Sequence, residues 1–333
     1  MRFRFRLISR LAYRFICSLL ICTALAGCHR QQDVTVLKLA HGLDPSHPTH
    51  KAMEYMAQRL QQLSGGTMRI DIYPSAQLGG EREVLELLQI GSVALTKVST
   101  SPMESFVPEF KVFSIPYVFR DYDHLWTVLQ GTLGKELLHA GESARLYGLG
   151  FYDAGSRSFY MNDASVNTPA DLAGKKIRVQ NSITSVKMVR ALGGAATPIP
   201  WAELYTALQE GVVDGAENNP PSYYLSKQYE VAPYFSLDEH TFVPDILLVS
   251  LPIWHSLTAR QQGWLQQAAD DSVVFQRKLW KQATADALAK LRKAGVTITH
   301  PDKQPFREAV APMLASYRGT AVGEFIQRIE AVK

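Results

Sequence analysis

Cysteine is scarce in this chain, with three among 333 residues and none after residue 28. Cys17 and Cys22 lie in an apolar run near the start, and Cys28 follows that run. The chain beyond Cys28 therefore has no internal disulfide and no thiolate metal site, even in an oxidising compartment. We expect hydrophobic cores to hold the fold together.

Motifs of enzyme chemistry are also missing. The sequence contains no nucleophile elbow, no phosphate-binding loop and no HExxH pair, and it shows no internal repeat or low-complexity segment. His41, His47 and His50 cluster early, but they lie without a cysteine around a proline-containing loop, which is a poor frame for metal ligands. We therefore expect no metal and no cofactor.

Acidic residues are absent from the first 27 residues, where five arginines precede the apolar run Phe15–Ala26. A basic segment before a short apolar run is typical of a secretory signal. The sequence Leu25-Ala26-Gly27-Cys28 resembles a bacterial lipobox, in which Cys28 would carry lipid; ordinary cleavage nearby, with Cys28 an incidental thiol, is the alternative. We expect a signal peptide over 1–27, a tether over 28–35, and a periplasmic, membrane-tethered lipoprotein.

The net charge of the precursor is misleading. Its formal charge is +4, and removing the five arginines of the signal gives 4 − 5 = −1. The basic balance therefore gives no reason to expect nucleic-acid binding. With 46% hydrophobic and 20% charged residues, the mature chain has the composition of a globular protein, and its length allows two domains.

The most informative stretch runs from Gly174 to Pro221. Lys175–Gln180 alternates like a short strand and contains Arg178, whose side chain needs an anion if it is half-buried. A helix capped at Ser182 or Thr184, a second helix opening at Trp201, and a strand over Val212–Glu217 follow. Ligands in such α/β units collect beyond the strand ends.

Arg178, Trp201 and Asn218 therefore converge on one predicted cavity. Each also has an ordinary explanation. Arg178 is as easily a structural ion pair, Trp201 a core residue, and Asn218 part of a turn before two prolines. The combination favours a binding site.

The flanking chain repeats the pattern of strands and helices. Strands are predicted over Val34–Ala40, Ile70–Tyr73, Gly148–Tyr152 and Gly295–Thr299, and a long helix from Thr258 to about Lys293. Lys97 and Ser99 share one face of a further strand. The chain is expected to cross between domains at Asp153–Arg157 and again at His240–Leu248, which Pro244 interrupts. The order indicates an α/β fold with mixed sheets.

Several runs in order resemble the DctP-type solute-binding subunit of tripartite ATP-independent periplasmic (TRAP) transporters. They are IDIYPSAQLGGEREVLELLQIGSVALT, KIRVQNS and ALGGAATPIPWAELYTALQEGVVDGAENN. The resemblance implies a two-lobed periplasmic binding-protein fold, each lobe a mixed sheet flanked by helices, with a long helix spanning both. We assign 36–154 and 244–282 to lobe I, and 155–243 and 283–333 to lobe II.

The resemblance also implies a ligand site. Arg178 matches the arginine that holds the substrate carboxylate by two parallel bonds, a task that suits a guanidinium. Arg157, in Gly155-Ser156-Arg157, matches a second ligand arginine. Asn218 follows the VDGxE motif, and Trp201 matches the aromatic residue that opens the next helix.

Other positions bear on the choice of ligand. Glu81 and His240 match residues that line the polar end of the cleft in sialic-acid binders. Lys97 and Ser99 replace an aromatic and an acidic residue of that type, which favours a smaller polyhydroxylated acid. Glu81 could pair with Lys97, and that pair would bind hydroxyls if it were buried. A contact from His47 to a sugar hydroxyl is also expected.

The segment HPTHKAMEYMAQRL looks like the subgroup that binds hexuronates. We therefore predict a binding protein, not an enzyme, that closes around a monocarboxylate sugar acid such as glucuronate or galacturonate and delivers it to the TRAP permease subunits. The alternatives are a C4-dicarboxylate or sialic acid as ligand, a sensor as partner, or a periplasmic enzyme using Glu81, Lys97 and His240 as an acid–base set.

Overall fold

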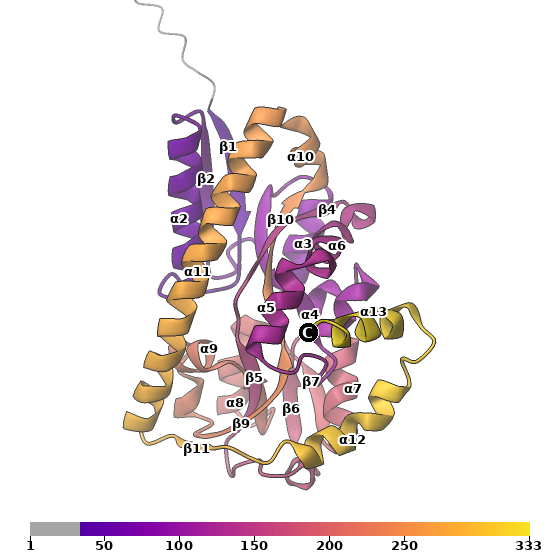
Figure 1. Ribbon diagram of the computed structural model, residues 1–333. Coiled ribbons are helices and arrows are strands. Elements are labelled where there is room, and N and C mark those ends of the chain that lie inside the picture. The colour runs from indigo at the N-terminus through magenta and orange to yellow at the C-terminus, as the bar shows by residue number, and fades with distance from the viewer. Residues whose placement is uncertain (1–33) are drawn as a thin grey trace, which may run out of the picture. The chain divides into compact units, whose positions relative to one another are not determined.

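Two β-sheets organise the chain, and each combines strands that are far apart in the sequence (Figure 1). The computed structural model describes residues 34–333, of which Val36–Lys333 belong together as one compact unit. The predicted signal peptide, the lipidation at Cys28 and most of the tether lie outside the described residues. No helix among residues 34–333 has the length and apolar character needed to cross a bilayer.

Sheet A has five strands in the order β2-β1-β3-β10-β4. Their bounds are β1 Thr35–Ala40, β2 Met68–Tyr73, β3 Leu95–Ser99, β4 Leu146–Tyr152 and β10 Asp245–Ser250. Strands β1 and β3 are parallel, whereas β10 runs antiparallel to both β3 and β4. A strand from late in the sequence thus completes the sheet that the first part of the chain begins.

Sheet B has six strands in the order β11-β9-β5-β8-β6-β7. Their bounds are β5 Ser156–Met161, β6 Lys176–Val179, β7 Ala195–Pro198, β8 Gly215–Asn218, β9 Tyr234–Phe242 and β11 Thr297–Thr299. Strand β8 lies between β5, to which it is antiparallel, and β6, to which it is parallel. The predicted α/β class with mixed sheets is confirmed.

Helices flank both sheets. The α-helices are α2 Pro48–Leu63, α3 Glu81–Gln89, α4 Thr100–Met103, α5 Tyr122–Gln130, α6 Thr132–His139, α7 Ile183–Ala191, α8 Leu204–Gln209, α9 Pro220–Leu225, α10 Leu251–Ser256, α11 Ala259–Lys293, α12 Gln304–Ala315 and α13 Ala321–Glu330. Short 3-10 helices are η1 Pro108–Phe113, η2 Glu142–Ala144, η3 Pro169–Leu172, η4 Trp201–Glu203 and η5 Gln228–Glu230.

Helix α11 runs past both sheets, packing on α2 and β4 and, farther along, on α9 (Figure 1). The side chain of Thr258 accepts a hydrogen bond from Gln261 N, and Gln261 bonds back to the Thr258 backbone, so a capping box begins the helix as predicted. Near the middle, Gln276 accepts from Asp153 N at 2.8 Å and donates to Asp153 O at 2.7 Å. The helix thereby holds the point where the chain leaves sheet A.

The chain passes between the sheets at the two predicted places. Residues 153–155 connect β4 to β5, and Val243 and Pro244 separate β9 from β10. Pro244 supplies no N–H for a sheet ladder, which fits the break between two strands at this point. The strands before and after each crossing belong to different sheets, so side chains at both crossings lie close to the space between them.

Three details differ from the sequence-based expectations. Strand β7 was missed, because Ala195–Pro198 has small residues and no apolar alternation, yet it pairs with β6. The strand expected over Val212–Glu217 begins only at Gly215 and includes Asn218. Helix α13, expected in lobe II, contacts η1 instead, and Arg328 pairs with Glu136. The exact lobe boundaries stay a prediction.

Candidate functional site

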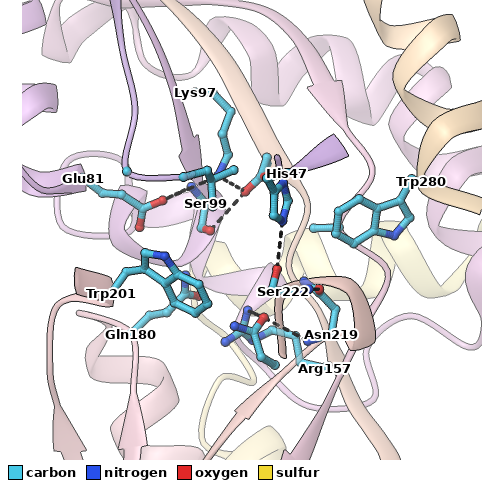
Figure 2. A pocket seen from close by; sticks show the side chains of 15 residues that line it. His47, Glu81, Lys97, Ser99, Arg157, Gln180, Trp201, Asn219, Ser222 and Trp280 are labelled. Atoms are coloured by element: carbon cyan, nitrogen blue, oxygen red, sulfur yellow. Dashed lines mark hydrogen bonds and ion pairs between the residues drawn. The ribbon is translucent and has the colours of Figure 1, made fainter. Parts of the chain in front are cut away.

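A cavity is lined by side chains from both sheets and from α11 (Figure 2). In this view Lys97, Ser99 and Glu81 lie on one side of it, and Arg157 and Asn219 lie on the opposite side. Of the residues expected at the site, six line this cavity: His47, Glu81, Lys97, Arg157, Trp201 and Asn218. Arg178 and His240 lie elsewhere and are described below.

The sheet B wall of the cavity carries an arginine whose charge is paired within the protein. Arg157, on β5, is 4% exposed, and its Nε and Nη2 donate to the carboxylate of Glu217. Nη2 also donates to Glu217 O at 2.7 Å, and Nη1 donates to Asn218 Oδ1 at 2.9 Å. The charge of Arg157 is thus already compensated by the adjacent strand, and Asn218 extends the network to the cavity surface.

Glu217 takes its electrostatic character from these neighbours. Burial acts to raise its pKa, but the charge and hydrogen bonds of Arg157 and the nearby His240 ring together outweigh burial, so the pKa of Glu217 is about 2. Burial likewise acts to lower the pKa of Arg157, and the charge and hydrogen bonds of Glu217, with smaller contributions from Tyr160 and Asp245, overcome it and raise that pKa. The two side chains form a buried ion pair in which each keeps the other ionised.

His240 lies behind Glu217 and does not line the cavity. It is fully buried, stacks on Phe159 with ring centroids 4.4 Å apart, and has Nδ1 2.7 Å from Asp238. Its Nε2 is 3.7 Å from Glu217 Oε2. In this geometry neither His240 nor Glu217 lines the cavity, and the expected contact of His240 with a ligand hydroxyl stays a prediction.

Arg178, on β6, has no such compensation. It is 3% exposed, and its Nε donates to Ile199 O at 2.8 Å. Among residues 34–333 no carboxylate lies within ion-pair distance, and no acceptor bonds to its two terminal nitrogens. Burial lowers the pKa of Arg178, although a guanidinium remains charged at neutral pH.

The side chain of Arg178 borders a second cavity that adjoins the first. Glu81, Gln180, Trp201 and Gly42 line both spaces, so the two are neighbours across these residues. Sheet topology explains the arrangement, because β5 and β6 flank β8 and bring Arg157, Asn218 and Arg178 to adjacent strands. Arg178, Trp201 and Asn218, which are predicted to converge on one cavity, therefore lie around two adjoining ones. Asn218 lines the first, Arg178 lines the second, and Trp201 lines both.

The sheet A wall carries a lysine between two acids. Lys97 Nζ lies 2.9 Å from Asp245 Oδ1 and 3.9 Å from Glu81 Oε1, with side chains that are 5%, 6% and 23% exposed, respectively. Ser99 donates its N–H to Glu81 Oε1 at 2.8 Å and its hydroxyl to Asp245 Oδ1 at 3.1 Å. The predicted pairing of Lys97 with Glu81 is thus the longer of two contacts, and Asp245 is the nearer partner.

The two walls are connected by a hydrogen bond next to the cavity. Thr49 N donates to His47 Nδ1 at 3.2 Å, which leaves the hydrogen of the neutral ring on Nε2. That nitrogen lies 3.2 Å from Ser222 Oγ on α9, so His47 is the donor. Burial, together with the Lys97 charge, lowers the pKa of His47 to about 3 and keeps the ring neutral.

Two tryptophans flank the cavity from opposite sides: Trp201, from η4, and Trp280, from α11 (Figure 2). His47 packs against Trp280, with ring centroids 5.8 Å apart. Aromatic faces of this kind suit the apolar C–H surface of a sugar ring, whereas the two walls between them are polar.

Two of the histidines near this site, His41 and His50, bond to each other. His41 Nε2 lies 3.0 Å from His50 Nδ1, and Leu43 N donates to His41 Nδ1 at 3.1 Å. Within residues 34–333, no group of three or more His, Cys, Asp or Glu side chains is arranged to hold a metal ion.

Sequence reasoning missed two residues of the site. Glu217 was read only as the end of a strand before Asn218, although an acid inside an otherwise small and apolar strand is a sign of a buried partner. Asp245 is the second residue that the sequence-based prediction lacks. It begins the apolar strand Asp245–Ser250, and an acid at the head of a fully buried strand is the same kind of signal.

The chain matches the family described as bacterial extracellular solute-binding protein, family 7 (DctP), over residues 39–320. It is 36% identical to a TRAP periplasmic solute-binding protein from Xanthobacter autotrophicus Py2, solved with bound β-D-galacturonate. That structure has a TM-score of 0.86, and the match covers 89% of this chain and 100% of the other.

Two further similarities bear on the ligand. A TRAP solute-binding protein from Pseudomonas putida F1, solved with bound D-glucuronate, is 35% identical with a TM-score of 0.86, covering 90% of this chain and 97% of that one. The C4-dicarboxylate-binding periplasmic protein DctP of Rhodobacter capsulatus is 30% identical over 84% of this chain and 85% of its own length.

Proposed function

Since the chain belongs to family 7 of the bacterial extracellular solute-binding proteins, the DctP family of TRAP transporters, we propose that it binds a hexuronate such as D-galacturonate or D-glucuronate. It captures this ligand outside the cytoplasm, closes its lobes around it and delivers it to the membrane permease. The hexuronates bound in similar structures at 35–36% identity support the choice of ligand.

One observation carries the proposal. Three buried cations surround the two adjoining cavities, and Arg157 and Lys97 have carboxylate partners at ion-pair distance. Within the described part of the chain, Arg178 has only a carbonyl partner. A buried cation without a counter-ion is costly, and a ligand carboxylate would remove that cost while accepting two parallel hydrogen bonds.

The remaining polar groups then contact the sugar. Arg157 and Asn218 supply donors from sheet B, and on the other side Lys97 from sheet A, Glu81 from α3 and His47 from the start of α2 contact hydroxyls. Trp201 covers an apolar face of the ring. The wrong ligand would leave several of these buried groups without partners, which is the physical basis of selection.

The energies are consistent with useful affinity. A hydrogen bond to a charged group contributes roughly 1.5–3 kcal/mol net, and a micromolar complex needs about 8 kcal/mol. Two bonds from Arg178 would therefore supply a large part of the affinity, and the hydroxyl contacts the rest. Nothing in this arrangement needs a chemical step, and we infer that the protein is a binder and not an enzyme.

We also propose that Cys28 carries lipid, on the strength of the Leu25-Ala26-Gly27-Cys28 sequence. Lipidation would keep the binder near the membrane that holds its permease. Intact mass after membrane extraction tests this, since a diacylated or triacylated chain is heavier than the peptide by its fatty acids, and Cys28→Ser would release the protein from the membrane.

Thermal denaturation with a ligand panel tests the main proposal. The panel contains D-galacturonate, D-glucuronate, succinate and N-acetylneuraminate, each added to the wild type and to Arg178→Ala. Ligand at one hundred times its dissociation constant stabilises by about 2.7 kcal/mol, so a uronate should raise the wild-type midpoint and leave that of the variant unchanged. A shift with succinate or N-acetylneuraminate alone would refute the uronate assignment.

A further inference from the structure

Asp245 is a buried acid of the cavity wall to which the proposed function gives no role. It is 4% exposed and lines the cavity at the start of β10. Sheet register pairs it with Ser99 on β3, and Lys97 lies two residues farther back on the same face of that strand. Asp245, Ser99 and Lys97 are therefore held by sheet A and not by a loop.

In the sheet A wall, Ser99 and Lys97 direct hydrogen-bond donors at the two acids of the same wall. Ser99 donates to Glu81 Oε1 and to Asp245 Oδ1, and Lys97 Nζ lies 2.9 Å from Asp245 Oδ1. Within the described residues, nothing donates to Asp245 Oδ2 or Glu81 Oε2, and neither atom is fully buried. Both residues line the cavity, so the wall presents two acceptor oxygens to a ligand.

The charge of this wall is opposite to that of the Arg178 end. One lysine faces two carboxylates, which leaves a net charge of −1, whereas Arg178 on sheet B has no carboxylate at ion-pair distance among the described residues. Burial raises the pKa of Asp245 even though the Lys97 charge beside it acts in the opposite direction, and the Glu81 charge adds to the rise. A second carboxylate brought to this wall would meet like charge in a site with little water.

We propose that Asp245 and Glu81 form an acceptor pair that binds neighbouring hydroxyls at the end of the ligand remote from its carboxylate, and that this pair excludes diacids. The inference rests on the proposed function and sharpens it. The protein distinguishes a hexuronate from the corresponding hexarate, in which the other end of the chain is also a carboxylate. C4-dicarboxylates are rejected by the same contact.

Calorimetric titration of the full chain at neutral pH tests this with two matched ligands, D-galacturonate and galactarate. Juxtaposed like charges cost several kcal/mol, so the wild type should bind galactarate about 100-fold more weakly than galacturonate. Asp245→Asn keeps the shape of the side chain and removes its charge. It should reduce the ratio of the two dissociation constants, galactarate over galacturonate, about tenfold or more. Asp286→Asn, an exposed site on α11, is the control and should leave the ratio unchanged.

Glu81→Gln removes the charge of the second acceptor, which lies on a different element, α3. It should also reduce the preference for galacturonate over galactarate. This second variant keeps the test decisive if Asp245→Asn does not fold. The proposal is overturned if the wild type binds galactarate within tenfold of galacturonate, or if both variants weaken the two ligands equally. Binding of neither ligand by a folded wild type would instead refute the proposed function itself.

Discussion

Arg157 and Arg178 are equally buried, at 4% and 3% exposure, and lie on the two strands that flank β8. Arg157 bonds to the carboxylate of Glu217 and the amide of Asn218, whereas among residues 34–333 Arg178 bonds only to the carbonyl of Ile199. The charge of Arg157 is thus paired within the protein, whereas Arg178 is the arginine that we propose for the ligand carboxylate. The difference shows that residue type and burial do not identify a binding residue until its partners are counted.

Removing the partner of Arg157 should produce the largest effect. Glu217→Ala leaves a buried guanidinium without its counter-ion, and breaking a buried pair in this way costs about 3–5 kcal/mol. Urea denaturation should show the loss as a lower midpoint with an unchanged slope. Arg178→Ala is the comparison, and without ligand it should lose far less stability because no ion pair is broken. Equal losses of stability in Glu217→Ala and Arg178→Ala would contradict the difference in charge compensation between the two arginines.

A conservative change at Arg178 should have the next largest effect, and on affinity instead of stability. Arg178→Lys keeps the positive charge but loses the planar fork, and with it one charge-assisted hydrogen bond worth roughly 1.5–3 kcal/mol. We expect D-galacturonate to bind about 10- to 100-fold more weakly by calorimetry. Unchanged affinity would mean that Arg178 acts as a simple charge or does not touch the ligand.

The most gradual effect concerns pH and the Arg157 side of the comparison. Burial would lower the pKa of His240, but Asp238 and then Glu217 raise it from 6.5 to about 9. Because the folded state holds this proton more tightly, its stabilisation is complete below pH 6.5 and is lost as pH rises toward 9. The free energy of unfolding should fall across that window by at most about 1.4 kcal/mol per pH unit.

His240→Gln should flatten this dependence. His139→Gln is the matched control, since the side chain of His139 is 53% exposed and contacts Glu142 and the ring of Tyr147 at the surface. The control should keep the slope of the wild type. A wild-type stability that rises between pH 6.5 and 9 would show that His240 does not carry its proton in the folded protein.

Regular elements with a strong local signal were predictable. The capping box at Thr258 and the long apolar stripe after it gave α11, and alternation gave β6 around Arg178. Strand β7 was not predictable in this way, because Ala195–Pro198 is small and partly exposed and is a strand only through its pairing with β6.

The site was predictable as a set of residue types but not as a set of partners. The resemblance predicts both Arg157 and Arg178 as ligand residues. It does not indicate that, among the described residues, Arg157 has a carboxylate partner and Arg178 has none. That depends on the antiparallel pairing of β5 with β8, which places Glu217 across from Phe159 and within reach of Arg157. Likewise Asp245 becomes the nearest acid to Lys97 only because β10 inserts next to β3, a contact 148 residues distant in the sequence.

The two aromatic flanks of the cavity have an optical consequence. Trp201 and Trp280 are two of only five tryptophans in the chain, and both border the cavity. Indole emission shifts with the polarity around the ring, so a sugar that displaces water there alters the fluorescence without any label. Trp280 also lies next to the crossing between the sheets, because a Cβ added at Gly155 would be 3.2 Å from its Nε1 atom. Its emission should therefore also change when the chain moves at that crossing. Stopped-flow traces of Trp201→Phe and Trp280→Phe would therefore separate the arrival of the ligand from the movement that follows it.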